Sequence, residues 1–366
     1  MAGSAQVKRK LWQTFDWSLF IVPLILVSAG IAVLFSLSFQ DTANFAIHQI
    51  IFAILGLGLC IVFTFLNYQS LKPVAYILYF VGLVLLVAVL FLGKTKFGAT
   101  RWISLGFFQL QPSEVFKLIL VIVLAKFFSS VEHFHWKYFI LIIALAFAPV
   151  FLVIKQPDVG TSLVLVIIFF SIIFTASISK IYWWVMGTGI VVFLPVIWFF
   201  LRDYQKARIY TFLNPMADPL NRGYHVLQST ITVGSGGLLG RGLGQGSQSV
   251  LQFLPEAHTD FIFAGWAEAT GFVGSLILIL LLVFLIWRII SIAMISRDNF
   301  GTFLAIGFAS MFLFQLLVNV GMNLGIMPVT GIPLPLVSYG GSSLLVNFIA
   351  LGILQSIYIR HKKLRF

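Results

Sequence analysis

The amino-acid sequence predicts an all-α polytopic membrane protein with about ten transmembrane helices. Of its 366 residues, 60% are hydrophobic and only 9% are charged, whereas soluble domains are about one quarter charged. A soluble fold of this length has too little interior to bury so much apolar surface. The apolar residues also recur in runs of about 20, the length that an α-helix needs to cross the hydrocarbon core of a bilayer.

Ten apolar runs are candidate membrane-spanning helices. The first follows the basic triplet Lys8-Arg9-Lys10; it is longer than a signal-peptide core and no small-residue cleavage site follows it, so we expect an uncleaved helix. The fifth to seventh runs lie so close together that a merged or re-entrant segment is an alternative. No internal repeat is evident, and we expect a single membrane domain over residues 1–366. The runs cover roughly 17–39, 46–66, 73–93, 113–129, 138–155, 159–178, 181–201, 260–288, 301–322 and 340–359.

The basic residues indicate the orientation of the helices. Lys and Arg gather at both ends of the chain and in alternate loops, and the short loops between these hold few. Because cytoplasmic loops collect Lys and Arg, we expect both termini in the cytoplasm. The long hydrophilic loop 202–259, between helices 7 and 8, then lies outside. Its basic residues run against the usual bias, and an anionic substrate would explain them; a flexible connector is the alternative, although long loops without function are uncommon.

Composition excludes several other classes of function. The net charge of +12 would indicate nucleic-acid binding in a soluble protein, but here the aromatic residues lie in the apolar runs and not beside the basic ones. We therefore expect contact with the lipid bilayer and none with nucleic acid. The single cysteine, Cys60, excludes an intramolecular disulfide and a cysteine metal cluster. The histidines lack the helical spacing of a zinc site, so no metal site is predicted.

Ionisable residues at membrane depth are costly and are therefore functional candidates. The first cluster combines Arg101, in the sequence Gly-Ala-Thr-Arg-Trp-Ile, with Gln-Pro-Ser-Glu-Val-Phe-Lys at 111–117. Glu114 and Lys117 are three residues apart and so share one helix face, where they can pair. One interpretation is a structural ion pair that fixes helix packing. The other is a cation that faces a cavity and receives a diphosphate.

A second cluster, Lys-Gln-Pro-Asp-Val-Gly-Thr at 155–161, lies in a very short outer turn between two runs. Asp158 precedes an apolar run, in the position of a helix N-cap. Turn and cap chemistry is therefore one interpretation of the cluster. The alternative is that Lys155 or Asp158 faces the same cavity as the first cluster.

The third cluster, Leu-Pro-Glu-Ala-His-Thr-Asp at 254–260, directly precedes a long apolar run. Asp260 is a candidate general base at the outer membrane boundary, where desolvation raises a carboxyl pKa and the helix dipole lowers it. The sequence leaves open which effect is larger. An N-cap role for Asp260, with Thr259 as a rival cap, is the alternative, and Glu256 and His258 are further candidates.

A fourth segment, 323–341, holds three prolines and several glycines before the last apolar run, and it includes Ser338. No helix can continue through it. Irregular backbone at membrane depth is tolerated where it is buried in protein or lines a cavity. We therefore expect a re-entrant loop that lines the cavity, with a purely structural plug as the alternative.

The order of these segments resembles the RodA/FtsW/SpoVE (SEDS) family over the whole chain. The most specific matches are Leu-Pro-Glu-Ala-His-Thr-Asp-Phe-Ile-Phe-Ala at 254–264 and Pro-Leu-Pro-Leu-Val-Ser-Tyr-Gly-Gly-Ser-Ser at 333–343. The sequence Pro-Val-Thr-Gly-Ile-Pro at 328–333 is more similar to the RodA branch than to the FtsW branch. One departure is Glu-Ala-Thr-Gly at 268–271, where the family usually has Glu-Glu-Leu-Gly; Glu268 stays a candidate.

The resemblance implies a ten-helix fold and a peptidoglycan glycosyltransferase that uses lipid II. It also implies partnership with a class B penicillin-binding protein, which is a transpeptidase, and with the elongation machinery. The family's essential acidic residue matches Asp260, the expected catalytic residue. We expect the substrate to be bound by residues of all four segments and of the outer loop: Arg101, Glu114, Lys117, Lys155, Asp158, Arg208, Arg222, Glu256, His258 and Ser338.

Chemistry constrains the mechanism of such an enzyme. An α-linked diphosphate donor and a β-1,4 product differ by one inversion, so one displacement and one base are sufficient. The diphosphate leaving group needs positive charge more than a proton donor. Arginine and lysine supply that charge, and a divalent cation (Mg or Mn) is a possible addition. Two alternatives remain: a lipid II flippase without chemistry, which would favour inverted repeats, and a scaffold that activates the penicillin-binding protein.

Overall fold

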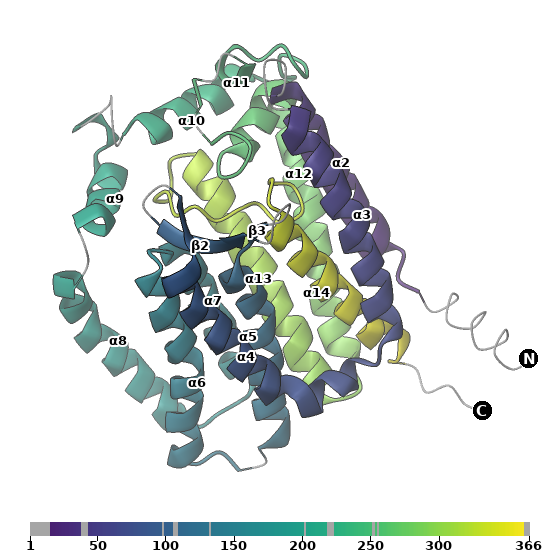
Figure 1. The fold of residues 1–366 in the computed structure, drawn as a ribbon, viewed down its shortest axis with the longest axis vertical. Helices are drawn as coiled ribbons and strands as arrows, with labels where there is room; N and C mark the ends of the chain where they lie inside the picture. Colours follow the sequence, from purple (N-terminus) through teal and green to yellow (C-terminus); the bar gives the residue numbers. More distant parts are fainter. Residues whose placement is uncertain are drawn as a thin grey trace, which may run out of the picture.

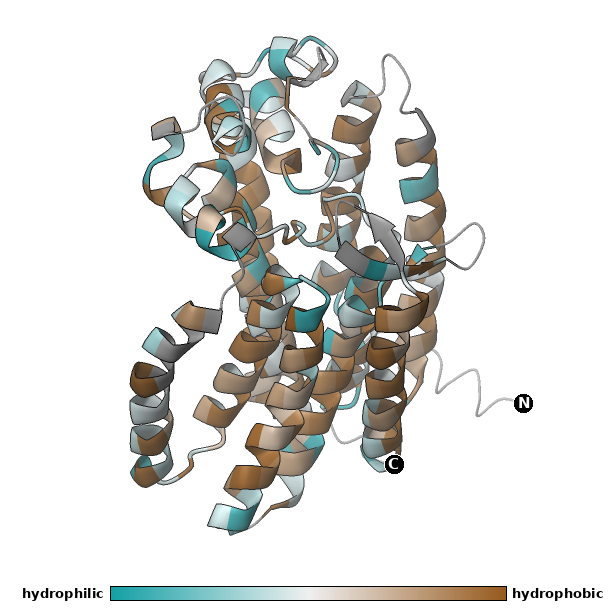
Figure 2. Ribbon diagram, turned by 60° about the vertical axis from the view of Figure 1, so that its left-hand side comes forward, coloured by the Kyte–Doolittle hydropathy of each residue, from teal (hydrophilic) through white to brown (hydrophobic). Residues whose placement is uncertain are grey.

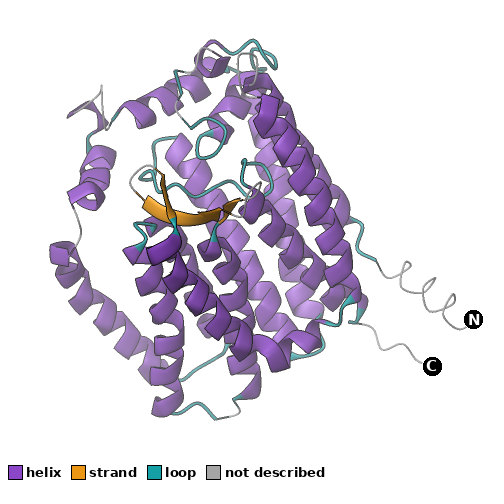
Figure 3. Ribbon diagram, viewed as in Figure 1, coloured by secondary structure: helices purple, strands orange, loops and turns teal. Residues whose placement is uncertain are grey.

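The computed structural model describes residues 15–37, 43–96, 99–104, 109–131, 133–200, 203–217, 223–250, 253–254 and 256–361. It is a bundle of long helices with a small antiparallel sheet partway along it (Figures 1 and 3), which confirms the predicted all-α fold class. Ten helices match the ten predicted runs in order: α2 (Ser18–Leu37), α3 (Ala43–Phe65), α4 (Leu71–Leu92), α5 (Pro112–Ser130), α6 (Trp136–Lys155), α7 (Val159–Thr175), α8 (Lys180–Phe200), α12 (Ile262–Ile295), α13 (Asn299–Asn323) and α14 (Gly341–Ile359).

Within the described part of the chain, seven of these helices are long and apolar enough, by length and composition, to cross a membrane: α2, α3, α4, α6, α12, α13 and α14. Of the other three, α5 carries charged residues and packs in the interior, α7 is shorter, and α8 lies at the outer edge (Figure 1). Because α6, α7 and α8 are separate helices, the alternative of a merged segment there is wrong. The chain is thus a multi-pass membrane protein.

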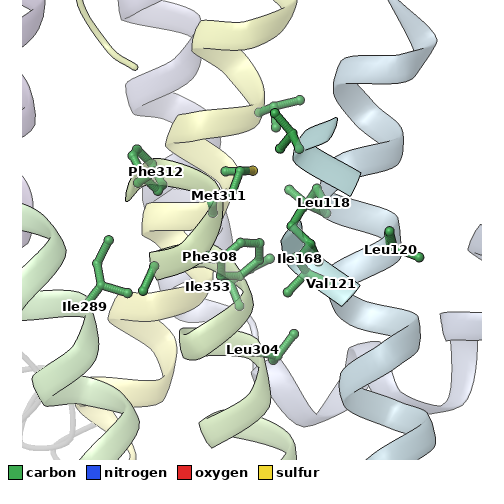
Figure 4. Close-up of a cluster of buried hydrophobic side chains, with 14 of the residues drawn as sticks. Leu118, Leu120, Val121, Ile168, Ile289, Leu304, Phe308, Met311, Phe312 and Ile353 are labelled. Carbon is green, nitrogen blue, oxygen red and sulfur yellow. The ribbon is translucent and has the colours of Figure 1, made fainter. Parts of the chain in front are cut away.

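The interior of the bundle is formed around α5 and α13, whose side chains are buried on almost every side. Figure 4 shows one layer of this core, in which Val121 of α5 and Phe308 of α13 meet Ile168 and Ile353 from two further helices. The outer helices instead expose large apolar side chains, such as Phe80 and Phe91 of α4, and Figure 2 shows the long helices predominantly in the apolar colours. That pattern is expected when lipid surrounds the bundle.

The first and last described residues lie at the same end of the bundle. Asp16, just before α2, forms an ion pair with Arg288 near the end of α12. The Arg288 guanidinium also lies 5.1 Å from the ring centre of Tyr358, in the last turn of α14. The position of the two described ends agrees with the prediction that both chain ends lie on one side of the membrane. That this side is cytoplasmic stays a prediction.

Toward the opposite end lie the sheet and most of the predicted outer loop. The strands β1 (Lys94–Lys96), β2 (Ala99–Ser104) and β3 (Gln109–Leu110) pair in that order. The described part of the loop is largely helical, so a merely flexible connector is wrong for it. Its elements are α9 (Asp203–Leu213), the 3-10 turn η2 (Pro215–Ala217), α10 (Tyr224–Ser235) and α11 (Ser247–Val250); a second 3-10 turn, η1 (Tyr68–Ser70), precedes α4.

The glycine-rich part of this loop is inserted into a break in α12. At Gly271 the helix is interrupted by a left-handed residue, with φ 69° and ψ −164°. The interruption removes two helical hydrogen bonds, and the loop satisfies the four backbone groups that are released. The replacement bonds are Phe272 N to Gly237 O (2.9 Å), Val273 N to Leu238 O (3.1 Å), Arg241 N to Glu268 O (2.9 Å) and Gly242 N to Ala269 O (3.0 Å). The loop is therefore fixed to α12 on both sides of the break at Gly271.

Candidate active site

The turn that precedes α12 presents Asp260. Glu256 has a left-handed backbone (φ 51°), and its carbonyl accepts hydrogen bonds from the amides of Thr259 (3.1 Å) and Phe261 (3.3 Å). The cap residue of α12 is Phe261, which makes no side-chain cap hydrogen bond. The alternative in which Asp260 or Thr259 caps the helix is therefore wrong, and the Asp260 carboxylate is available for another role.

The segment 324–340, between α13 and α14, lies over this turn. The Ser338 hydroxyl donates to the carbonyl of Thr259 (2.7 Å) and accepts from the amide of Leu334 (2.8 Å). The amide of Tyr339 donates to the carbonyl of His258 (3.0 Å). Ser338 is buried, so in this structure it joins two backbone segments.

Gly331 brings the same segment close to the Asp260 side chain. Its backbone is left-handed, with φ 75°. A Cβ atom at this position would lie 3.4 Å from Oδ2 of Asp260. The carboxylate therefore faces irregular backbone and not the body of the bundle. Among the described residues it accepts no hydrogen bond and forms no ion pair.

The pKa of the Asp260 carboxyl is raised from 3.8 to about 6. Burial is the largest cause, followed by the neighbouring carboxylate of Glu256. The guanidinium groups of Arg208 and Arg101 oppose the shift, and Asp158 adds to it weakly. Burial and the Glu256 charge thus outweigh the two arginine charges. The charges that act on Asp260 thus come from four other residues that the sequence predicted, in three further segments and its own: Glu256, Arg208, Arg101 and Asp158.

His258 is the rival candidate for the base. Its imidazole stacks on the ring of Phe45, with ring centres 4.4 Å apart, and its Nε2 lies 3.7 Å from the Glu256 carboxylate. Burial lowers the pKa of His258, although the Glu256 charge opposes this. The histidine is therefore held against an aromatic ring at one side of the site.

Arg101 of β2 holds the turn between α6 and α7. Its Nε donates to the carbonyl of Gln156 (3.2 Å), its guanidinium also donates to the carbonyl of Pro157, and its Nη1 lies 3.8 Å from Asp158. Asp158 in turn accepts from the amide of Thr161 (3.1 Å) and caps α7, so the cap interpretation is confirmed. Both residues are thus occupied by structural contacts as well as lying near Asp260.

Three other predicted residues, Glu114, Lys117 and Lys155, are not brought to Asp260 in this way. Lys117 and Glu114 form an ion pair of 2.7 Å with both side chains almost fully buried. The predicted pairing is therefore confirmed, and whether its role is structural or substrate-binding stays a prediction. Lys155 is exposed on α6, 5.3 Å from the ring centre of Phe151, which is itself exposed. Arg222 lies outside the described residues.

Sequence inspection missed two asparagines of α13. The side-chain amides of Asn319 and Asn323 both donate to the backbone carbonyl of Asp260, at 3.0 and 3.1 Å. The available signal was three amide side chains spaced four residues apart in the apolar part of α13, Gln315, Asn319 and Asn323, because buried polar groups need partners. Glu268 has a comparable supporting role: it is buried and accepts from the amide of Gln248 (2.9 Å) in the outer loop.

A further feature of the described structure is how the side chains that could hold a metal ion are arranged. Within the described ranges, no three of the His, Cys, Asp and Glu side chains converge as metal ligands. Asp260 and Glu256 are the two neighbouring carboxylates of the site.

Comparison with known proteins identifies the family. A family model described as "Cell cycle protein", for FtsW, RodA and SpoVE, matches residues 10–363. The peptidoglycan glycosyltransferase MrdB of Escherichia coli (strain K12) is 40% identical, with 98% of this chain and 97% of the relative covered. A chain of a solved peptidoglycan synthase complex that coordinates polymerization and crosslinking is 34% identical, with a TM-score of 0.81 and 95% and 99% of the two chains covered. The crystal structure of the rod shape determining protein RodA of Thermus thermophilus is 30% identical, with a TM-score of 0.72 and 95% and 97% covered. This chain belongs to the FtsW/RodA/SpoVE family.

Proposed function

We propose that this chain is a peptidoglycan glycosyltransferase that polymerises lipid II into β-1,4-linked glycan at the outer face of the bacterial cytoplasmic membrane, for cell elongation and shape. The activity named for its relatives supports the reaction class. The observation that carries the proposal is the Asp260 carboxylate. It lies just before a membrane-spanning helix, has a pKa of about 6, and has no hydrogen-bond or ion-pair partner among the described residues.

In the proposed reaction Asp260 is the general base. It takes the proton from the 4-hydroxyl of the acceptor sugar while that oxygen attacks the anomeric carbon of the donor. The carbon–oxygen bond to the diphosphate breaks in the same displacement, and the configuration inverts from α to β. A general base of this kind contributes roughly 10²–10⁴-fold to the rate. A carboxyl with a pKa of about 6 is ionised at neutral pH and still basic enough to accept a proton.

The diphosphate leaving group carries its negative charge away from the sugar and needs cations nearby. Arg208 of α9 and Arg101 of β2 are the two arginines whose charges act on Asp260. Arg101 is held by backbone carbonyls and Asp158, so its position is fixed. We therefore assign the leaving-group contact to Arg208 and Arg101 together.

The proposal includes a partner and an orientation. A relative of similar fold belongs to a synthase complex that couples polymerization to crosslinking, which supports a class B penicillin-binding protein as the partner of this chain. Both described chain ends lie at the end of the bundle opposite Asp260. With Asp260 at the outer face, both termini are cytoplasmic.

The test is polymerisation of labelled lipid II by the purified chain and its class B partner in proteoliposomes. We expect glycan strands, resolved by gel, and none when the acceptor sugar lacks its 4-hydroxyl. Movement of lipid II across the vesicle membrane without any glycan would instead support a flippase. Glycan that appears only when a second polymerase is supplied would support a scaffold.

A further inference from the structure

The described structure contains an unusual start to α12. In a regular helix the amide of Ala264 would donate to the carbonyl of Asp260, four residues earlier. Instead, Ala264 N donates to Phe261 O (3.1 Å) and to the side-chain oxygen of Asn323 (3.1 Å). The nitrogen of the same Asn323 side chain donates to the carbonyl of Asp260 (3.1 Å). One carboxamide from α13 thus takes the place of the missing helical hydrogen bond.

A second carboxamide extends this arrangement to the opposite side of the site. The side-chain nitrogen of Asn319 donates both to the carbonyl of Asp260 (3.0 Å) and to the carbonyl of Ile332 (2.8 Å). Ile332 follows Gly331, the residue that faces the Asp260 carboxylate. Asn319 therefore fixes the distance between the backbone of Asp260 and the segment that lies over its side chain.

Both asparagines are fully buried on α13, and their groups are paired. Their relative exposures are 0%. The side-chain nitrogen of Asn323 also donates to the backbone carbonyl of Asn319 (2.8 Å) and, over a longer distance, to the side-chain oxygen of Asn319 (3.5 Å). Placing two amides in an apolar helix is costly unless every group has a partner. Here the partners include the backbone groups of Asp260, Ala264 and Ile332. These contacts are therefore made where the chemistry is proposed to occur.

We propose that Asn319 and Asn323 are positioning residues of the glycosyltransferase reaction, which hold Asp260 outside α12 with its carboxylate toward the segment 324–340. This inference rests on the proposed function. Without Asn323, the amide of Ala264 can return to the carbonyl of Asp260, and α12 gains a turn at its start. Asp260 then enters the first helical turn, its carboxylate moves away from the acceptor hydroxyl, and the helix dipole favours its ionised form.

The test measures kcat, KM for lipid II and the pH profile of the chain in complex with its class B partner. For Asn323→Ala we expect kcat to fall by about 10- to 100-fold, as is typical when a catalytic group is displaced by about 1 Å. The KM for lipid II should stay within about twofold, since the substrate contacts are kept. The acidic limb of the kcat profile should move to lower pH, because the helix dipole lowers the pKa of Asp260. A merely structural role would lower the melting temperature and leave the pH limb unchanged.

Two further variants complete the design. Asn323→Asp has the same size and still accepts a hydrogen bond from Ala264 N, but its ionised side chain cannot donate to the Asp260 carbonyl. We therefore expect a similar loss of kcat. This variant carries the test if Asn323→Ala does not fold.

Asn347→Ala is the control. It removes another buried asparagine, on α14, whose side chain has no hydrogen bond within the described structure. Its kcat should stay within about twofold of wild type, as expected for a group outside the reaction.

The outcomes separate this inference from the proposed function. Wild-type glycan synthesis with unchanged kcat and pH limb in both Asn323 variants would overturn the positioning role alone. The positioning role would also be overturned if each variant lost activity only in proportion to its loss of folded protein. No glycan from the wild-type complex would overturn the proposed function and this inference together.

Discussion

The carboxylate of Asp260 faces the α-carbon of Gly331, so closely that a Cβ atom on the glycine would lie 3.4 Å from Oδ2. Any side chain at this position would occupy the space in front of the proposed base. Gly331 also has a left-handed backbone, with φ 75°, which costs other residues roughly 1–2 kcal/mol. The glycine therefore has two separable roles, one in backbone conformation and one in access to the carboxylate.

Gly331→Ala should lower the polymerisation rate by at least about tenfold, as misplacement in an active site does. Gly325→Ala is the matched control. Gly325 lies in the same segment with φ 73°, but its Cβ would meet Thr230 at 3.1 Å and not Asp260. Both variants should lose similar thermal stability, and only Gly331→Ala should lose activity. Equal activities in the two variants would show that the approach to Asp260 is unimportant.

The pH dependence should follow the pKa of Asp260. The base must be ionised, so kcat/KM should rise with pH through a midpoint near 6. Glu256→Gln removes the neighbouring negative charge and should move this midpoint to lower pH, whereas Arg208→Gln removes a positive charge and should move it to higher pH. Initial rates of lipid II polymerisation measured from about two pH units below to about two pH units above the midpoint give both shifts. Shifts in the same direction would contradict the electrostatic assignment.

The buried ion pair of Glu114 and Lys117 offers a test of its two interpretations. Lys117→Met leaves the Glu114 carboxylate buried without its partner, which should cost about 3–5 kcal/mol in stability. The double variant Glu114→Gln/Lys117→Met should regain most of the melting temperature in detergent. If the pair is only structural, the double variant also regains polymerase activity. A stable but inactive double variant would mean that Lys117 contacts the substrate.

The insertion of the outer loop into α12 depends on Gly236. A Cβ at this position would lie 2.0 Å from the backbone oxygen of Ala267, which cannot move aside easily. Gly236→Ala should therefore lower stability by about 1–3 kcal/mol, as overpacking does, and should release the loop from the helix. Two residues earlier, Gly234 is helical and has open space around it; Gly234→Ala should be neutral or stabilising by about 0.5–1 kcal/mol. Amide hydrogen exchange of residues 268–273 would detect release of the loop.

The sequence predicted the long helices well because their apolar runs are longer than 15 residues and end in polar or proline-rich segments. The short helices of the outer loop carry no such run and were not predicted. The break in α12 depends on backbone hydrogen bonds to Gly237 and Leu238, more than 30 residues earlier, and no local pattern encodes such a pairing.

The sequence predicted the part of the site that lies in one short motif and missed the part that distant segments form. Asp260, Glu256 and His258 lie in one short motif, so their proximity follows from the chain itself. Lys155 ends a helix whose residues are apolar on all sides, so its direction was not readable, and the structure turns it outward beside Phe151. Asn319 and Asn323 act on the Asp260 carbonyl from 59 and 63 residues away, a contact that only the folded bundle creates.

Substitution of Asp260 also has a consequence for stability that serves as a folding control. The folded-state pKa of Asp260 is raised above 3.8 to about 6, so the folded protein binds the proton more tightly than the unfolded chain. The contribution of this group to stability is therefore greatest below pH 3.8 and is lost as the pH rises through about 6. Asp260→Asn, which is neutral at all pH values, should melt at an equal or higher temperature than wild type at pH 7.5, a pH at which Asp260 is ionised.

The decisive measurement is the initial rate of lipid II polymerisation by Asp260→Asn and by wild type, each in complex with the class B partner at neutral pH. The variant should fold, bind the partner and retain the KM-determining contacts, yet its rate should be lower by about 10²–10⁴-fold, the contribution of a general base. A folded, partner-bound Asp260→Asn chain that makes glycan at the wild-type rate would contradict the assignment of Asp260 as the base and direct attention to His258.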